Sequence, residues 1–342
     1  MTSWITKGIS MLTKIDKVNS ESLALAKQIM LNSGVVAFPT ETVYGLGAIA
    51  TDDIAVKQIY AVKGRPSDNP LIVHIHKEYD IEKLVKKAQP YVTKLFNAFV
   101  PGPLTMVFES RNTVSNIVTC GGDTLAIRVP SHKDAQSFLS YIDMPVAAPS
   151  ANLSKHVSPV TAQHVYNDLN GKIRLILDGG KCEVGIESTV LDVTGDIPKI
   201  LRPGFVTQEM VASVCGDCQI ARHLSTDKVR SPGVKYKHYS PNCKTLLYNE
   251  NQLEEVLLAY NSALKDGKKP YVLCGDDIAK KLKVKNLLNL GGTPIEMASN
   301  LYDLLLYGEN VADIIIGVEP IEKKGLLSGV TNRLEKACAQ SK

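Results

Sequence analysis

Two cations, Lys63 and Arg65, stand in a nine-residue stretch that also holds Pro66 and Pro70. Proline fixes φ and lacks a backbone donor, so this stretch is not expected inside a helix or a strand. It predicts a shaped loop that presents both cations just ahead of an apolar run at 71–75. An arginine fork and a lysine ammonium on one loop suit a phosphate group. The alternative is a solvated surface turn, because charged clusters mostly lie in water.

Six further blocks of small, polar and proline residues accompany this stretch along the chain. They occupy residues 38–47, 101–105, 125–130, 149–154, 185–190 and 201–204. In this order, the seven blocks closely resemble the threonylcarbamoyl-adenylate synthase family, the YrdC-like enzymes of transfer-RNA modification. The resemblance covers roughly residues 20–215. Residues 231–241 look like the linker of the family's long, two-domain form.

The resemblance implies an enzyme that makes L-threonylcarbamoyl-adenylate from L-threonine, bicarbonate or CO2, and ATP, with release of pyrophosphate. A separate tRNA threonylcarbamoyl-transferase machinery would then move the group to the adenosine next to the anticodon. Such a nucleotidyltransferase needs positioning and charge neutralisation rather than a covalent nucleophile. We expect Mg²⁺ on the ATP phosphates and no organic cofactor.

The resemblance also implies the ATP contacts. Lys63 and Arg65 are the expected catalytic cations. The expected ATP-binding residues are Arg65, Asn69, Thr124, Ser150, Asn152, Ser158, Arg202 and Tyr239. Tyr236 is the alternative to Tyr239 as the linker tyrosine that closes on ATP. For both residues, the simpler interpretation is an exposed tyrosine in the linker.

A second set of residues would hold L-threonine. By resemblance these are Thr42, His74, Arg128, Ala148 and Ser188. Arg128 interrupts an apolar strand, and a half-buried charge is costly unless it is paired. It therefore either clamps the substrate carboxylate or pairs with an internal acid. His74 alone is more typical of a core histidine, and Glu41 and Glu187 are candidates for deprotonating the amine or for holding a lysine.

A chain of 342 residues with 44% apolar composition predicts two domains with ordinary cores. We expect a catalytic domain over 1–221, a basic linker that acts as a lid over 222–241, and a C-terminal domain over 242–342. From Arg222 to Lys244, the sequence has six lysines or arginines and one acid. The role of the C-terminal domain is not specified by its topology.

The hydrophobic pattern of the first domain favours an α/β fold with one twisted, partly antiparallel sheet, because strands outnumber helices. The expected strands are 34–38, 71–75, 106–108, 125–129, 146–148, 175–177, 189–192 and 199–201, and the expected helices are 20–31, 52–62, 91–99, 133–140, 161–169 and 207–214. In the second domain, strands at 245–248, 271–274, 287–290 and 313–318 alternate with helices at 251–266, 276–283, 294–307 and 326–339. This alternation predicts a smaller, Rossmann-like parallel sheet.

Several other features limit the function. No uncharged run approaches the length of a membrane span, and seven cysteines without a repeated spacing fit a reducing compartment, so the cytoplasm is expected. Residues 45–50 match the dinucleotide pattern G-x-G-x-x-A, but a helix does not follow at once, so we expect a tight turn instead. Cys215 and Cys218 have the spacing of half a zinc site, and no second closely spaced pair accompanies them.

Two other functions are consistent with parts of the chain. A net charge of +4 and the basic linker leave weak RNA binding open, although aromatic residues for base stacking make up only 6% of the chain. A carbamoyl-transfer module of hydrogenase maturation shares the expected fold. That family carries an acylphosphatase-like part and paired cysteine fingers, and neither pattern is present in this sequence.

Overall fold

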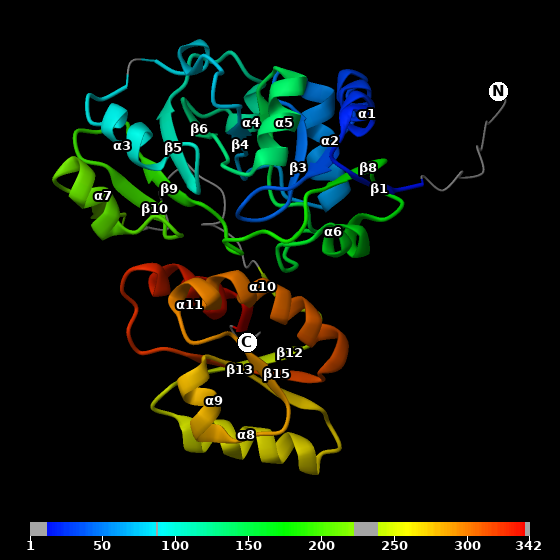
Figure 1. Ribbon diagram of the computed structural model, residues 1–342, viewed down its shortest axis with the longest axis vertical. Helices are drawn as coiled ribbons and strands as arrows, with labels where there is room; N and C mark the ends of the chain where they lie inside the picture. Colours follow the sequence, from blue (N-terminus) through cyan, green and yellow to red (C-terminus); the bar gives the residue numbers. More distant parts are fainter. Residues whose placement is uncertain (1–11, 87, 222–238, 339–342) are drawn as a thin grey trace.

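The structure, a computed structural model, describes residues 12–86, 88–221 and 239–338. Figure 1 shows a larger α/β unit above a smaller one. Most of the predicted linker, including Tyr236, lies outside the described residues. Its proposed action as a lid and its boundaries therefore stay predictions. Tyr239 is described and is buried.

The larger unit is built on a single eleven-stranded sheet. Its strand order is β1-β8-β2-β3-β7-β4-β6-β5-β9-β10-β11, with parallel and antiparallel neighbours. The strands are β1 (Lys14–Lys17), β2 (Val36–Phe38), β3 (Gly45–Ile49), β4 (Ile72–His74), β5 (Leu104–Glu109), β6 (Thr124–Arg128), β7 (Val146–Ala147), β8 (Leu175–Asp178), β9 (Thr189–Asp192), β10 (Lys199–Arg202) and β11 (Gln219–Ile220). The predicted mixed sheet is confirmed.

Helices cover this sheet and seal two apolar clusters. They are α1 (Ser20–Leu31), α2 (Asp53–Lys63), η1 (Ile81–Lys83, a 3₁₀ turn), α3 (Val92–Phe99), α4 (Asn116–Thr119), α5 (Lys133–Ile142), α6 (Ala162–Leu169) and α7 (Gln208–Cys215). Helices α1 and α5 pack together on β2 and β8, around Met30 and Phe138. The periodic apolar faces of these helices explain why their predicted ranges are confirmed to within two residues.

The prediction of a tight turn at 45–50 is wrong. Gly45 and Gly47 lie in β3, which pairs with β2 on one side and β7 on the other. A Cβ on Gly47 would lie 2.8 Å from Cγ1 of Val146 and 3.0 Å from Cε1 of Phe38. The glycines therefore let a neighbouring side chain approach the strand closely, and no turn is needed.

The basic stretch also differs from the prediction at its start. Lys63 is the last residue of α2 and not part of the loop. Gly64 follows in the left-handed region at φ 60°, and the amide of Arg65 donates to the carbonyl of Tyr60, 3.0 Å away. The loop therefore begins at the glycine that ends the helix. Only Arg65 of the two cations belongs to it.

The smaller unit has a four-stranded parallel sheet in the order β12-β15-β13-β14, as predicted. Its elements are β12 (Lys244–Asn249), α8 (Leu253–Lys265), β13 (Pro270–Cys274), α9 (Asp276–Leu282), β14 (Leu287–Asn289), α10 (Pro294–Val311), β15 (Ile314–Glu319) and α11 (Leu326–Cys338). In Figure 1, α10 and α11 lie between this sheet and the larger unit.

The two units share one apolar core. A single cluster of buried residues runs from the α2 side of the large sheet to Leu301, Leu305 and Val330 of α10 and α11. Backbone also approaches backbone closely, since a Cβ on Gly329 would lie 3.2 Å from Cα of Gly204. The smaller unit is therefore packed firmly against the larger one.

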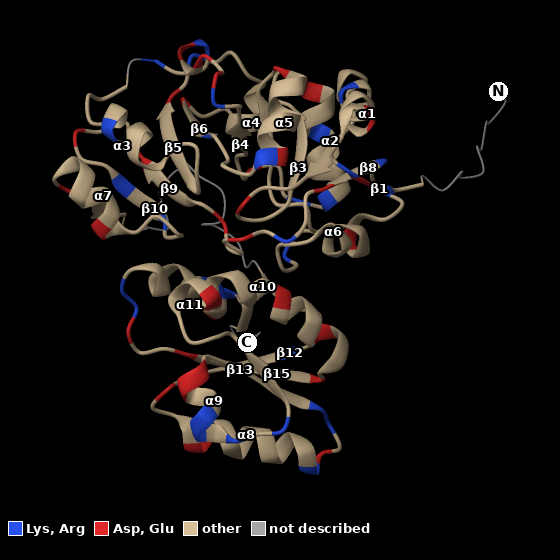
Figure 2. Cartoon of the chain, viewed as in Figure 1, with Lys and Arg blue, Asp and Glu red and all other residues tan. Residues whose placement is uncertain are grey.

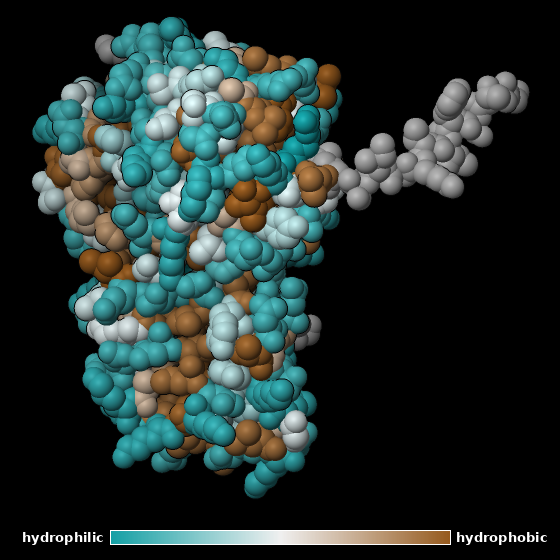
Figure 3. All heavy atoms as spheres, turned by 45° about the vertical axis from the view of Figure 1, so that its right-hand side comes forward, coloured by the Kyte–Doolittle hydropathy of each residue, from teal (hydrophilic) through white to brown (hydrophobic). Residues whose placement is uncertain are grey.

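The surface carries charges of both signs on both units (Figure 2). Hydrophilic residues cover most of the face in Figure 3, and apolar residues show between them on both units. Among the described residues, none of the helices combines the length and the apolar character that crossing a bilayer requires.

Candidate functional site

A pocket opens in the larger unit beside its contact with the smaller one. It encloses about 640 Å³, counting the space that opens to solvent. Eleven of the predicted site residues line it: Thr42, Arg65, His74, Arg128, Ala148, Ser150, Asn152, Ser158, Ser188, Arg202 and Tyr239. The structure thus brings together residues from six of the seven blocks recognised in the sequence, three residues outside these blocks, and Tyr239 from the described end of the predicted linker.

Arg128, at the end of β6, has two partners at the pocket wall. Its Nη1 donates to Oγ1 of Thr42 at 2.7 Å, and its Nη2 lies 2.9 Å from Oε2 of Glu41. Arg128 and Glu41 are both buried. The internal acid that the sequence left open therefore exists, and Arg128 still faces the pocket. Its role as a carboxylate clamp stays a proposal.

The hydroxyl groups next to Arg128 form an ordered chain. Thr40 Oγ1 donates to the carbonyl of Val43 at 2.7 Å, and it lies 2.9 Å from Oγ1 of Thr42. Because the proton of Thr40 is used on Val43, Thr42 donates to Thr40 and accepts from Arg128. Thr42 therefore presents a remaining lone pair to the pocket.

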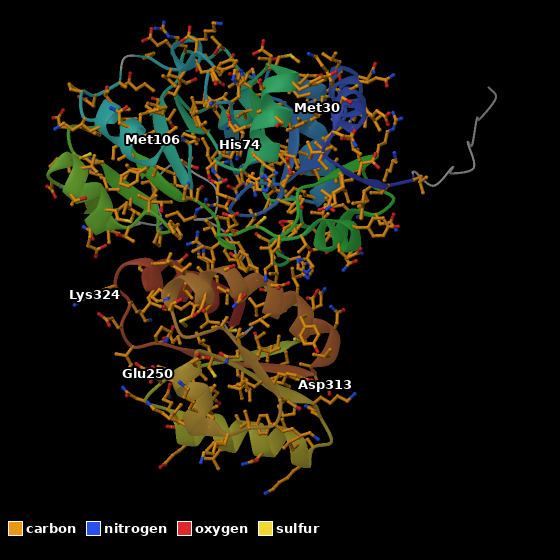
Figure 4. The ribbon with its side chains drawn as sticks, in the orientation of Figure 1. Met30, His74, Met106, Glu250, Asp313 and Lys324 are labelled. Atoms are coloured by element: carbon orange, nitrogen blue, oxygen red, sulfur yellow. The ribbon has the colours of Figure 1, made fainter. Side chains whose placement is uncertain are left out.

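His74 lies at the end of β4, in the interior of the larger unit (Figure 4). Its ring meets Phe38 edge-on, with the centroids 5.9 Å apart, and its Nδ1 lies 3.2 Å from the carbonyl of Ile72. Burial, followed by the nearby charge of Arg128, lowers the pKa of His74 to about 3. The imidazole is therefore neutral, so it offers the pocket a flat wall without charge.

The loop after α2 leaves buried polar atoms unsatisfied. Arg65 Nη2 donates to the carbonyls of Asn69 and Pro70, both at 3.3 Å. Among the described residues, Nε of Arg65 and both side-chain polar atoms of Asn69 are buried without a hydrogen-bond partner. Buried polar groups are usually paired. This edge of the pocket is therefore suited to a polar ligand.

Arg202, at the end of β10, also lines the pocket. Its Nη2 donates to the carbonyl of Ser188 at 2.9 Å and to Oγ of Ser188 at 3.2 Å. Ser188 Oγ also lies 2.8 Å from Oγ1 of Thr105. Tyr239 covers this end of the pocket, and its ring stacks on Tyr302 with centroids 5.4 Å apart.

Three predicted residues do not line the pocket. Lys63 is buried behind it, where Nζ donates to the carbonyls of Ser150 and Asn152. Asn69 lies next to Arg65, as described above, and Thr124 begins β6 opposite Glu109 of β5. Burial, and next the charge of Arg65, hold the pKa of Lys63 well below its usual range. Lys63 thus fixes the 150–152 loop in this structure, while its catalytic role and the ATP roles of Asn69 and Thr124 stay predictions.

Other residues line the pocket without having been predicted. They are Thr40, Val43, Tyr44, Gly45, Ile72, Pro149 and His156. Glu187, a candidate from the sequence for deprotonating the amine or holding a lysine, also lines the pocket, and it is the one acid among the described lining residues. Most of these residues fall inside the recognised blocks, so their place in the sequence was a usable signal. His156 stands outside the blocks, and only its three-dimensional contacts identify it.

Glu187 is bound on both carboxylate oxygens. Ser158 Oγ donates to Oε1 at 2.6 Å, whereas the hydroxyl of Tyr302 donates to Oε2 at 2.8 Å. Arg333 Nε also donates to Oε2, at 3.1 Å. Burial alone would raise the pKa of Glu187, but the charges of Arg333 and Arg202 and these hydrogen bonds hold it at about 2. The carboxylate is therefore ionised and has little capacity left for a metal ion.

The described residues contain no group of three or more His, Cys, Asp or Glu side chains arranged to hold a metal. The pocket instead offers cations, hydroxyls and one occupied carboxylate. This inventory suits an anionic ligand.

Comparisons with known proteins agree with this arrangement. A family model described as "Telomere recombination" (Sua5_yciO_yrdC) matches residues 28–204, and one described as "Threonylcarbamoyl-AMP synthase, C-terminal domain" matches residues 206–339. A threonylcarbamoyl-AMP synthase of Pyrococcus abyssi is 38% identical over 94% of this chain and 95% of its own length. The Bacillus subtilis enzyme of the same name is 41% identical over 93% of each chain.

The solved structures include a similar fold over almost the whole chain. A crystal structure of P. abyssi Sua5 in complex with L-threonine matches with a TM-score of 0.86 and 36% identity. The match covers 96% of this chain and 97% of that one. The similarity therefore includes both units and their arrangement.

Proposed function

This chain belongs to the threonylcarbamoyl-AMP synthase family, and from that premise we propose that it forms L-threonylcarbamoyl-adenylate from L-threonine, bicarbonate or CO2, and ATP. The enzyme is a transferase, and more finely we assign it as a nucleotidyltransferase. A carboxylate oxygen of N-carboxy-L-threonine attacks the α-phosphorus of ATP. The bond from that phosphorus to the bridging oxygen breaks, and pyrophosphate leaves.

One observation carries this proposal: a single pocket joins Arg65 and Arg202 to the group formed by Arg128, Thr42 and His74. The first pair suits phosphates, because guanidinium groups match their oxygens in charge and in shape. The second group suits an amino acid. A reaction between ATP and a carboxylated amino acid requires both ends in one cavity.

At the phosphate end, we propose that Arg65 and Arg202 neutralise the charge that develops as pyrophosphate leaves. Arg65 has a buried Nε without a partner among the described residues. Ser150, Asn152, Ser158 and Tyr239 line the same pocket and would add neutral contacts to ATP. Lys63 remains a proposed catalytic cation, and Asn69 and Thr124 remain proposed ATP-binding residues, although the three do not line the pocket.

At the amino-acid end, we propose that Arg128 holds the carboxylate of L-threonine. The lone pair of Thr42 would accept a hydrogen bond from the substrate's nitrogen or hydroxyl. Ser188 lies deeper, between Thr105 and Arg202, and would contribute a second polar contact. Ala148 lines the pocket and is buried, and its methyl group would form a small apolar wall beside the side chain of L-threonine.

We propose that Mg²⁺ enters with ATP, coordinated by phosphate oxygens. Glu187, the one acid among the lining residues that the structure describes, already binds Ser158, Tyr302 and Arg333. The protein would therefore orient a metal–nucleotide substrate through its cations and hydroxyls. No carboxylate cage of its own is required.

We also propose that the adenylate passes to a tRNA threonylcarbamoyl-transferase machinery, which modifies the adenosine beside the anticodon. Cytoplasmic localisation belongs to the same proposal. Weak binding of RNA by this chain would be a separate property.

Pyrophosphate release from ATP provides the test of this function. Purified protein is incubated with Mg²⁺ and ATP, with and without L-threonine and bicarbonate, and with no RNA. Release should require both L-threonine and bicarbonate, and chromatography should detect the adenylate. Release without either, or the absence of the adenylate, would contradict the proposal.

A further inference from the structure

Glu187, at the pocket wall, takes part in the contact between the two units. One oxygen of its carboxylate accepts from Ser158, which belongs to the larger unit. The other oxygen accepts from Tyr302 of α10 and from Arg333 of α11, which both belong to the smaller unit. The same carboxylate thus joins the pocket to the second domain.

Arg333 makes further contacts besides its hydrogen bond to the carboxylate of Glu187. It is 0% exposed, and its Nη1 donates to the carbonyl of Pro203 while its Nη2 lies 3.4 Å from the carbonyl of Glu187. A buried arginine is costly unless its donors are satisfied. All of these acceptors belong to the larger unit. Arg333 therefore fixes both the side chain and the backbone of the segment that begins with Glu187.

We propose that Tyr302 and Arg333 are positioning residues of the adenylation reaction, through which the C-terminal domain completes the ATP site. This inference deepens the proposed function and rests on it. Neither residue lines the pocket. They act through Glu187 and Ser158, and Tyr302 also supports the ring of Tyr239.

The consequence for ATP follows from the position of one proton. A serine hydroxyl has one proton to donate, and Ser158 gives it to the ionised Glu187. Ser158 can then only accept a hydrogen bond from the ligand. It is therefore suited to a ribose hydroxyl or an adenine amino group, and it would repel a phosphate oxygen. The C-terminal domain thus sets the hydrogen-bonding direction of a contact in the pocket.

Tyr302→Phe tests this inference with little change in volume. The variant keeps the ring that stacks on Tyr239 and removes the hydroxyl that binds Glu187. We expect the KM for ATP to rise about 10-fold, because a hydrogen bond to a buried charge is lost, while the KM for L-threonine stays within about twofold. Tyr260→Phe is the matched control, since Tyr260 is also buried in the small domain and its hydroxyl accepts from the amide of Asn286.

Arg333 permits a second test through the pH profile. Glu187 is faced by Arg333 and Lys336 of α11, Arg202 of β10, Tyr302 of α10 and Tyr239. Arg333→Gln removes one cation, so the pKa of Glu187 should rise and kcat/KM for ATP should fall as the solution is made acidic, over a range where the parent profile is flat. Arg333→Lys restores a cation and should restore the flat profile.

Three results would overturn the inference. The first is a parent-like KM for ATP in Tyr302→Phe. The second is an equal increase in Tyr260→Phe, which would indicate general destabilisation of the small domain. The third is a parent-like pH profile in a folded Arg333→Gln; if that variant fails to fold, the tyrosine comparison decides alone. Calorimetric ATP binding separates this inference from the proposed function, because Tyr302→Phe should bind ATP about 10-fold more weakly even if the parent made no adenylate.

Discussion

Nε2 of His156 lies 2.9 Å from Oε2 of Glu309, although 153 positions separate the two residues and they belong to different units. Nδ1 of the same ring lies 2.9 Å from Oδ2 of Asp168, in α6. Burial opposes the charged form, but the hydrogen bonds that the ring donates to Asp168 and Glu309 outweigh it and raise the pKa of His156 to about 9. A protonated imidazole therefore bridges two carboxylates where the units meet.

This bridge predicts a pH-dependent contribution to stability. Because the folded pKa lies above the unfolded value, the stabilisation is fully present below pH 6.5 and is lost as the pH rises through about 9. His156→Gln should lower the free energy of unfolding by about 2–3 kcal/mol at pH 6 and by much less at pH 10, measured by denaturant unfolding.

A matched control for this prediction is His76→Gln. His76 also lies beside two acids, Asp143 and Glu78, but both belong to the larger unit. Hydrogen exchange of the α10 amides should therefore accelerate in His156→Gln and stay at the parent rate in His76→Gln. An equal loss of stability at pH 6 and pH 10 would refute the charged bridge.

Arg65→Ala should reduce adenylate formation by about 10²- to 10³-fold, because a preorganised cation at the transferring phosphoryl group is lost. Lys57→Ala is the control, since Lys57 is an exposed cation on the preceding helix α2. Pyrophosphate release and circular dichroism together give the answer. A folded Arg65→Ala with parent turnover would remove Arg65 from the reaction.

A test of Arg128 requires a variant that also removes the charge of its partner Glu41. Arg128→Ala leaves Glu41 buried without its cation, which typically costs about 3–5 kcal/mol, so weak L-threonine binding could reflect unfolding. Combining Glu41→Gln with Arg128→Met removes both charges. This double variant should recover stability and still fail to bind L-threonine, while ATP affinity stays near the parent value.

Calorimetry of the double variant against Glu41→Gln alone separates the two roles of Arg128. Normal L-threonine binding in the stable double variant would show that Arg128 serves only as the partner of Glu41. Loss of both ligands together would indicate a general change in the pocket. Only a selective loss of L-threonine supports the clamp.

Much of the fold could be predicted from the sequence because its signals are local. Helix α2 begins where Asp52 accepts from the amides of Ile54 and Ala55, and the alternating strands and helices after residue 244 gave the parallel sheet. The strand at Gly45 and Gly47 was missed because glycine is unfavourable in strands by propensity. Glycine is needed in this strand because the side chains of Phe38 and Val146 pack closely against it. The sequence around residue 45 does not show where those side chains lie.

For the site too, local patterns could be predicted from the sequence and long-range contacts could not. Seven of the eleven predicted lining residues fall inside the recognised blocks, where each block carries its own pattern, and His74, Ala148, Ser158 and Tyr239 were implied by the family resemblance at positions outside them. The partners of those residues could not be predicted, because Tyr302 and Arg333 approach Glu187 across more than a hundred residues of chain. Lys63 was assigned to the loop because it stands in the same short stretch as Pro66 and Pro70, which do not fit the interior of a helix. The structure shows that α2 ends at Gly64. Lys63 therefore lies in the helix and donates to the carbonyl of Ser150, whereas Arg65 lies in the loop.

Gly185 provides a last test of how the two units depend on each other. Its φ is 74°, and a Cβ at this position would lie 2.6 Å from the carbonyl oxygen of Ala298 and 2.6 Å from Cα of Ser299, both in α10. Gly185→Ala therefore combines backbone strain with a clash against the smaller unit. Gly216→Ala, at φ 91° with nothing within 4 Å, carries the backbone strain alone.

We expect Gly216→Ala to cost about 1–2 kcal/mol of stability and to keep parent activity. Gly185→Ala should cost about 1–3 kcal/mol more, because the clash has backbone on both sides and neither side can rotate away. It should also weaken ATP binding, since Glu187 lies two residues further along the same segment. Denaturant unfolding and ATP calorimetry measure the two effects. If both variants lose the same stability and bind ATP equally, the contact between Gly185 and α10 is loose, and the smaller unit does not set the position of Glu187.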